Sequence, residues 1–258
     1  MSLIQIYPTV DRQFKDEVVL EYEFIIIAVH GLDYVDATGT CAGSSWREPA
    51  GQVWLSVFLR ENNIKARLFL YEYDSQDTFK GVSGNMSTGA DDLIRQISTA
   101  RTNFQNPIIL IGHGLGGILI KQALVNATQR SDWSAIKNDT RGILFFGTPH
   151  TMNRQPSRWL NATFIPAAWN PKQPSSYYPQ LLPRVDEFRE QVEDYQFISF
   201  YGDADEVVPS ESAVMQLPGH RETQVRLTLS HHRLCMLTVG SDDYRKVTRN
   251  LLQLMSTF

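Results

Sequence analysis

One stretch of the chain, residues 107–125, constrains the fold more than any other. It reads PIILIGHGLGGILIKQALV, so a short apolar run passes through a glycine-rich turn directly into a second, longer apolar segment. An uninterrupted apolar run of this length is typical of a β-strand buried on both faces. A buried strand that continues at once into a helix is the repeating unit of a mostly parallel sheet covered by helices. We therefore predict an α/β fold.

The rest of the chain repeats this alternation of strand-like and helix-like segments. Its 258 residues are within the range of one large domain, and we expect a single domain over 1–258. The predicted strands span residues 24–29, 66–71, 107–111, 142–146, 196–201 and 224–229. The predicted helices span residues 52–61, 91–103, 115–130, 183–192 and 242–255.

Residues 151–183 do not fit the alternation. This segment contains six prolines and the large aromatic residues Trp159, Phe164 and Trp169. Long irregular insertions in compact domains are usually lids or binding loops. We predict a lid or cap here, with the three aromatic residues contacting an apolar substrate. The alternative is a small satellite core beneath a long loop.

Composition excludes several classes of partner. The formal net charge of −4 gives no support for nucleic-acid binding. Charged residues interrupt the first 17 positions, and no apolar run approaches the length of a membrane span, so we expect neither a signal peptide nor an integral membrane segment. Cys41 and Cys235 lie far apart without a metal-binding spacing, which favours free thiols and a cytoplasmic location.

The histidines show no metal-ligand spacing, and no cofactor motif is present, so we expect neither a metal nor an organic cofactor.

The turn in the first stretch reads Gly112-His-Gly-Leu-Gly116. A strand, a G-x-S-x-G turn and a helix form the nucleophile elbow of a large class of hydrolases, in which the central serine side chain is lifted above the sheet. Here the central residue is Gly114. Three interpretations remain: a plain glycine-rich turn, a catalytic serine replaced deliberately, or a natural departure from serine. Glycine accepts the positive φ of an elbow without steric cost.

With these residues in view, the sequence resembles the serine-active-site-containing, lipase-like α/β hydrolases, which are common in fungi and related to enzymes that deacylate lipid anchors. The matching motifs run in order between about residues 24 and 250. They are AVHGL at 28–32, WL at 54–55 with FL at 58–59, YEYDS at 71–75, IGHGLGG at 111–117 with IKQAL at 120–124, FFGTPH at 145–150 and VVP at 207–209. The resemblance implies the α/β-hydrolase fold, and Gly114 departs from the family's serine.

The resemblance also implies an acid and a base. Residues 202–209 match a lipase-like G-x-x-D-x-x-V-P pattern that selects Asp205, with Asp203 and Glu206 as neighbouring alternatives. The base is expected in the SHHRLC segment at 230–235, where alignment on the cysteine selects His231, which we take as the base; the following arginine makes His232 the alternative. Elbow, acid and base thus follow one another along the chain in the order that is typical of this fold.

Backbone N–H groups of Leu115 and Leu32 are expected to stabilise an oxyanion, because these residues follow the elbow and the His30-Gly31 pair. We interpret His30, Gly31 and His113 as supporting residues that line the substrate site.

An acyl-enzyme cannot form on Gly114. A substitute nucleophile in the loop after the first central strand, such as Cys41, Ser44 or Ser45, is one alternative. The other is that an Asp–His pair acts as a general base for direct hydrolysis, elimination, isomerisation or cyclisation of an apolar or lipid-like ester or carbonyl compound. A non-catalytic ligand-binding or sensing pseudohydrolase is the competing class.

Overall fold

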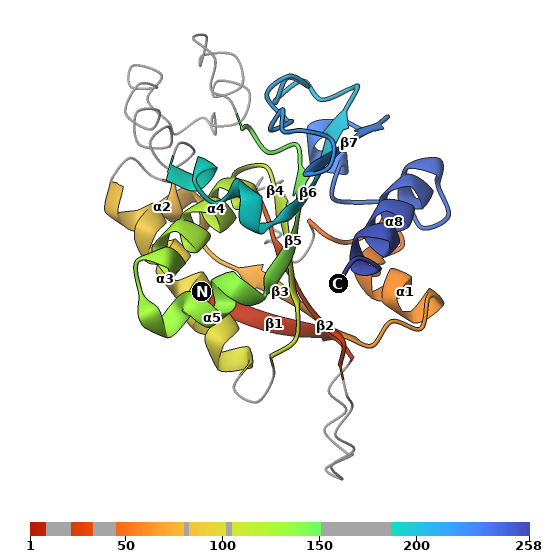
Figure 1. Cartoon of the computed structure of the whole chain (residues 1–258). Helices are drawn as coiled ribbons and strands as arrows, with labels where there is room; N and C mark the ends of the chain where they lie inside the picture. The colour runs from red at the N-terminus through yellow and green to blue at the C-terminus, as the bar shows by residue number, and fades with distance from the viewer. Residues whose placement is uncertain (9–21, 33–44, 80–82, 102–104, 151–186) are drawn as a thin grey trace.

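Seven strands form one sheet at the centre of the protein, with helices on both of its faces (Figure 1). This arrangement is seen in a computed structural model that describes residues 1–8, 22–32, 45–79, 83–101, 105–150 and 187–258. The strand order is β1-β3-β2-β4-β5-β6-β7. All neighbouring strands are parallel except β1, which pairs antiparallel with β3 at one edge. The predicted mostly parallel sheet between helical layers is confirmed.

The strands and helices have the following bounds. The strands are β1 Ser2–Tyr7, β2 Phe24–Val29, β3 Ala66–Glu72, β4 Ile108–His113, β5 Thr140–Phe146, β6 Gln196–Gly202 and β7 Glu222–Leu227. The helices are α1 Trp54–Glu61, α2 Ser75–Thr78, α3 Ser83–Ala100, α4 Leu115–Thr128, α5 Ser134–Asp139 and α8 Asp242–Met255.

Alternation along β2 divides the core into two apolar clusters. Ile25, Ile27 and Val29 belong to the cluster beneath α3 and α4, whereas Ile26 and Ala28 belong to the cluster beneath α1 and α8. Successive side chains of a strand point to opposite faces, so an all-apolar strand can bury both. Each fully buried aliphatic side chain contributes about 1.5–3 kcal/mol of burial free energy.

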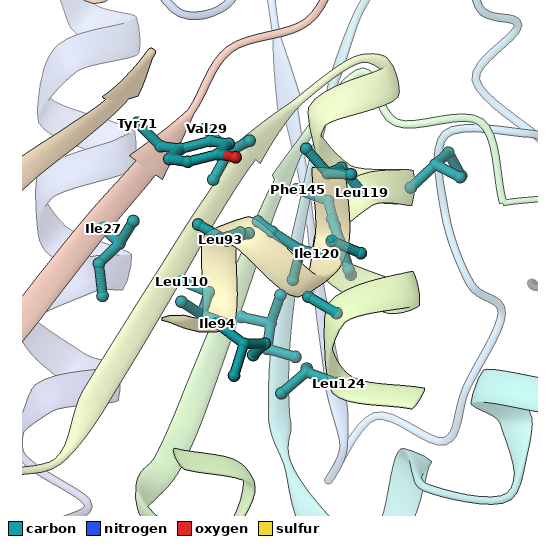
Figure 2. Close-up of a cluster of buried hydrophobic side chains, with 14 of the residues drawn as sticks. Ile27, Val29, Tyr71, Leu93, Ile94, Leu110, Leu119, Ile120, Leu124 and Phe145 are labelled. Carbon is teal, nitrogen blue, oxygen red and sulfur yellow. The ribbon is translucent and has the colours of Figure 1, made fainter. Parts of the chain in front are cut away.

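Helices α3 and α4 pack against each other over one face of the sheet. Figure 2 shows this cluster at close range, with apolar side chains of the two helices beside those of β2 and β4; the labelled residues are Ile27, Val29, Tyr71, Leu93, Ile94, Leu110, Leu119, Ile120, Leu124 and Phe145. Nearly every residue of α4 is buried, which fits a helix that runs directly out of the central strand β4.

Most predicted elements correspond to observed ones, but the short helices α2 and α5 were not predicted, and further differences concern β1, α3 and β7. Strand β1 was not expected, because it is an edge strand whose residues are only partly buried. Helix α3 begins eight residues before the predicted residue 91, because packing against α2 and α4 stabilises a stretch of weak helix formers. Strand β7 starts and ends two residues earlier than predicted.

The predicted helix over residues 183–192 lies partly outside the described residues. Of its described part, residues 187–189 are helical. The predicted lid, residues 151–183, lies wholly outside them. No helix of the described residues has the length and apolar character that crossing a membrane requires.

Candidate active site

The turn between β4 and α4 has the backbone geometry of a strained elbow. Gly114 adopts φ 50° and ψ −124°, a conformation that L side chains rarely take. Its N–H donates to the Phe146 carbonyl at 2.9 Å, which ties the turn to the end of β5. A Cβ on Gly116 would lie 2.2 Å from the His30 carbonyl oxygen, so the elbow and the end of β2 touch backbone to backbone. This contact needs glycine at position 116.

Asp205 and His231 form a buried hydrogen-bonded pair. His231 Nδ1 lies 2.9 Å from Asp205 Oδ2, and the side chains are 6% and 1% exposed. The other carboxylate oxygen accepts the backbone N–H groups of Val207 and Val208 at 2.9 and 2.8 Å. These bonds fix the carboxylate, which in turn favours the tautomer with hydrogen on Nδ1. The lone pair of Nε2 is then available to accept a proton.

The Nε2 atom of His231 points at the position that a side chain on Gly114 would occupy. A Cβ on Gly114 would lie 3.2 Å from Nε2, 3.7 Å from Cε1 of the same ring and 3.8 Å from the Cα of Gly31. Hydrogen bonds to nitrogen span about 2.7–3.2 Å, so an oxygen atom near this point could donate to Nε2. Elbow, acid and base of the sequence-based prediction therefore meet at one place.

The alternative acids and the alternative base have other surroundings than Asp205 and His231. Asp203 forms an ion pair with Arg226 on the surface, and Glu206 is exposed. The ring centroid of His232 lies 5.8 Å from that of His231, with the planes nearly perpendicular. Burial, and then the neighbouring His231, lower the pKa of His232. The carboxylate of Asp205 is hydrogen-bonded to His231.

Two further histidines, His113 and His30, lie close to the site. His113 Nε2 donates to the His231 carbonyl at 3.0 Å, and the two rings are tilted with centroids 4.8 Å apart. His30 Nδ1 donates to the Gly31 carbonyl at 2.8 Å. Burial lowers the pKa of His30 to about 4 and that of His113 well below its ordinary value, so both rings are neutral. That these histidines line a substrate site stays a prediction.

The expected oxyanion donors flank the elbow. Leu115 is the first residue of α4, and the first N–H groups of a helix have no acceptor within it. Leu32 is half-buried and follows Gly31, whose Cα lies beside the elbow. The predicted contacts of Trp159, Phe164 and Trp169 lie outside the described residues, as do Cys41 and Ser44.

Sequence reasoning missed Gly147, which follows β5 and adopts φ +55°. A Cβ there would lie 3.1 Å from both Asp205 Oδ2 and His231 Nδ1, and 2.8 Å from a methyl carbon of Leu234. The Asp–His hydrogen bond is therefore packed against bare backbone. The sequence signal was present, since Gly147 belongs to the FFGTPH motif, but nothing in the sequence connects it with the acid and base.

We expect Gly147→Ala to destabilise the protein by about 2–4 kcal/mol, as the sum of left-handed strain and overpacking. It should also separate the Asp205–His231 pair. Chemical denaturation measures the loss, with Gly219→Ala as control because a Cβ at Gly219 meets nothing within 4 Å. Equal stability of the two variants would contradict the packing described here.

Sequence reasoning also missed a buried amine in α4. Lys121 of α4 is 1% exposed, and its Nζ lies 2.7 Å from His150 Nδ1. The rings of Phe145 and Phe188 lie 5.4 and 5.6 Å from the same nitrogen. Burial, and then the positive charge of Arg189, lower the pKa of Lys121 to about 7. The only signal in the sequence is that Lys121 is the one charged residue of α4.

Comparisons with known proteins agree with this architecture. No protein-family model matches the chain. Protein SERAC1 of Homo sapiens is 29% identical over 150 residues, which cover 56% of this chain and 23% of the human protein. The match thus spans less than a quarter of that relative's length.

Two solved structures are similar over nearly the whole chain. Est1E from Butyrivibrio proteoclasticus has a TM-score of 0.55 at 16% identity, covering 98% of this chain and 93% of its own. The Bacillus licheniformis lipase BlEst2 in mature form has a TM-score of 0.54 at 14% identity, covering 89% and 91%. Together with the sheet order and the strand–turn–helix elbow, these similarities show that the chain has the α/β-hydrolase fold.

Proposed function

We propose that this protein catalyses acyl transfer from an apolar ester, using Asp205 and His231 to activate an oxygen nucleophile that comes from outside the chain. The observation that carries the proposal is the position of His231 Nε2, 3.2 Å from the point where a side chain on Gly114 would begin. With Nδ1 bonded to Asp205, the ring is oriented as a general base directed at the elbow.

In the simplest form of this reaction the nucleophile is water. Water donates its proton to Nε2 while its oxygen bonds to the ester carbonyl carbon, and the carbonyl oxygen becomes an oxyanion. Backbone N–H groups of Leu115 and Leu32 would stabilise that charge. As the tetrahedral species collapses, the imidazolium returns the proton to the departing alkoxide. Asp205 stabilises the imidazolium throughout and does not itself take the proton.

The expected rate is modest. Loss of the serine in a comparable triad costs on the order of a millionfold in kcat, and the remaining groups retain about 10³–10⁴ over the uncatalysed reaction. A slow, histidine-dependent esterase fits this range.

We also propose an apolar or lipid-like acyl substrate. Support comes from the aromatic and proline-rich composition of residues 151–183 and from the names of similar proteins, among them a lipase.

Hydrolysis of p-nitrophenyl butyrate tests the role of His231. We expect His231→Gln to remove the protein-dependent turnover, because the remaining groups cannot accept the proton. The matched control is His232→Gln, which changes the adjacent, half-buried histidine and should retain most of the activity. If both variants retained full turnover, the general-base proposal would be wrong.

A non-catalytic binding module is the second candidate, and the lack of any nucleophilic side chain at Gly114 favours it. This candidate predicts no turnover by the unaltered protein but a rise in melting temperature on adding a fatty acid. The same rise should persist in His231→Gln.

A further inference from the structure

We propose that Lys121 is a positioning residue for the acid–base pair, because its hydrogen bond to His150 ties the helix that carries the elbow to the segment that packs against the pair. The inference rests on the proposed function and deepens it, since it names a residue remote from the reacting atoms on which the geometry of Asp205 and His231 depends. The segment in question is residues 147–150, which directly follow β5 and are called the post-β5 segment.

One end of the post-β5 segment contacts the acid–base pair itself. A Cβ on Gly147 would lie 3.1 Å from Asp205 Oδ2 and 3.1 Å from His231 Nδ1, so the backbone of Gly147 lies against the bond between these two atoms. The Gly147 N–H donates to the Phe200 carbonyl at 2.9 Å, at the end of the sheet. A displacement of this segment therefore reaches the pair without an intervening side chain.

The other end of the post-β5 segment contacts the loop that carries the acid. The His150 N–H donates to the Ser212 carbonyl at 2.6 Å. The N–H groups of Ser212 and Ala213 in turn donate to the Pro209 carbonyl at 2.8 and 3.0 Å, which closes a turn in the loop that follows Asp205. His150 thus holds the acid loop, three residues after the glycine that lies against the pair.

Helix α4 contacts the post-β5 segment at two points. A Cβ on Gly117 would lie 2.2 Å from Thr148 Oγ1, so the first turn of α4 packs directly against Thr148. Further along the helix, Lys121 Nζ lies 2.7 Å from His150 Nδ1. Because α4 begins at Leu115, directly after the elbow, this bond fixes the elbow helix and the post-β5 segment relative to each other. Alignment of the elbow with the acid–base pair requires such a connection.

The bond is costly for the fold, which argues against a role in stability alone. Lys121 and His150 are 1% and 3% exposed, and the rings of Phe145 and Phe188 lie close to the amine. Burial lowers the pKa of Lys121 to about 7 and that of His150 well below its ordinary value. His150 Nε2 has no hydrogen-bond partner among the described residues. A methionine at position 121 would fill similar space without this cost, and costly buried polar groups are expected at functional sites.

The first test is spectroscopic and needs no turnover. The proton on His231 Nδ1 is shielded from exchange by its bond to Asp205, and its downfield NMR resonance is assigned by its absence from His231→Gln. We expect Lys121→Met and His150→Phe each to shift or broaden this resonance at pH 8. Lys65→Met, a change at an exposed lysine, is the matched control and should leave the resonance unchanged.

The second test is kinetic, with p-nitrophenyl butyrate as substrate. Each single variant should lower kcat by up to about a hundredfold with KM little changed, because a misplacement of about 1 Å caused far from the chemistry can cost that much. Since both residues act through one bond, the double variant should lose no more than either single variant. If Lys121→Met does not fold by circular dichroism, His150→Phe carries the same test.

Two results would overturn the inference. An unchanged resonance and an unchanged kcat in the folded variants, whatever their loss of stability, would assign Lys121 to the core alone. Losses that add in the double variant would show that the two residues act separately. Either result would leave the proposed function intact as long as turnover depends on His231. A displaced resonance in a protein without His231-dependent turnover would instead support the positioning and reject the proposed function.

Discussion

Replacing Gly114 by serine is expected to raise ester turnover by at least about a thousandfold, and by as much as a millionfold if the whole triad is restored. The serine Cβ would start 3.2 Å from His231 Nε2, so the ring must move by a few tenths of an ångström, and the elbow already has its positive φ. The measurement is kcat for p-nitrophenyl butyrate in Gly114→Ser beside the unaltered protein.

The gain should depend on the acid. Adding Asp205→Asn to the serine variant should lower kcat by up to about 10⁴-fold, because the amide cannot hold the imidazole in the correct tautomer. Gly114→Ala controls for the added Cβ and should give no gain. A folded serine variant with no more turnover than Gly114→Ala would show that the pocket no longer supports acyl-enzyme chemistry.

The second large effect concerns Lys121. Its amine lies in an apolar pocket against His150, and its pKa is lowered from 10.5 to about 7 in the fold. Between these two values the unfolded chain holds a proton that the folded chain does not, so stability rises with pH across that window. From pH 7 to pH 9 the contribution of this one group should be about 2 kcal/mol.

Urea denaturation of Lys121→Met at pH 7 and pH 9 isolates this contribution. The variant should lack the part of the pH-dependent gain that comes from Lys121, whereas Lys65→Met, at an exposed lysine, should retain it. The quantity to compare is the difference in pH-dependent stability between each variant and the unaltered protein, since other groups also titrate. A Lys121→Met protein with the same pH dependence as the unaltered chain would mean that the amine stays charged in the fold.

The central strands could be predicted from the sequence because burial on both faces leaves an unmistakable apolar run. Strands β2, β4 and β5 are of this kind. The edge strand β1 alternates partly buried and exposed residues and pairs with a strand far away in the chain, so no local pattern distinguishes it. Helix α3 extends into a stretch of serine, threonine and glycine whose helical state depends on tertiary packing.

The candidate site was predictable where a motif fixes a residue to the end of a strand. Gly114, Asp205 and His231 follow β4, β6 and β7, and parallel strands end at one edge of the sheet. The preference for His231 over His232 rested only on alignment with Cys235, since adjacent residues share the motif and only the direction of each ring distinguishes them. Gly147 acts through close packing with distant residues, which spacing along the chain does not encode.

We propose that a complete acid–base pair faces an elbow that lacks only its side chain. Treatment with an alkyl fluorophosphonate followed by intact mass measurement tests it most directly, because the probe reacts only with a nucleophile that a base has activated. We predict no adduct on the unaltered protein, one adduct on Gly114→Ser located at position 114, and none when His231→Ala is added. A folded Gly114→Ser protein that stays unlabelled, or one labelled equally without His231, would contradict the account.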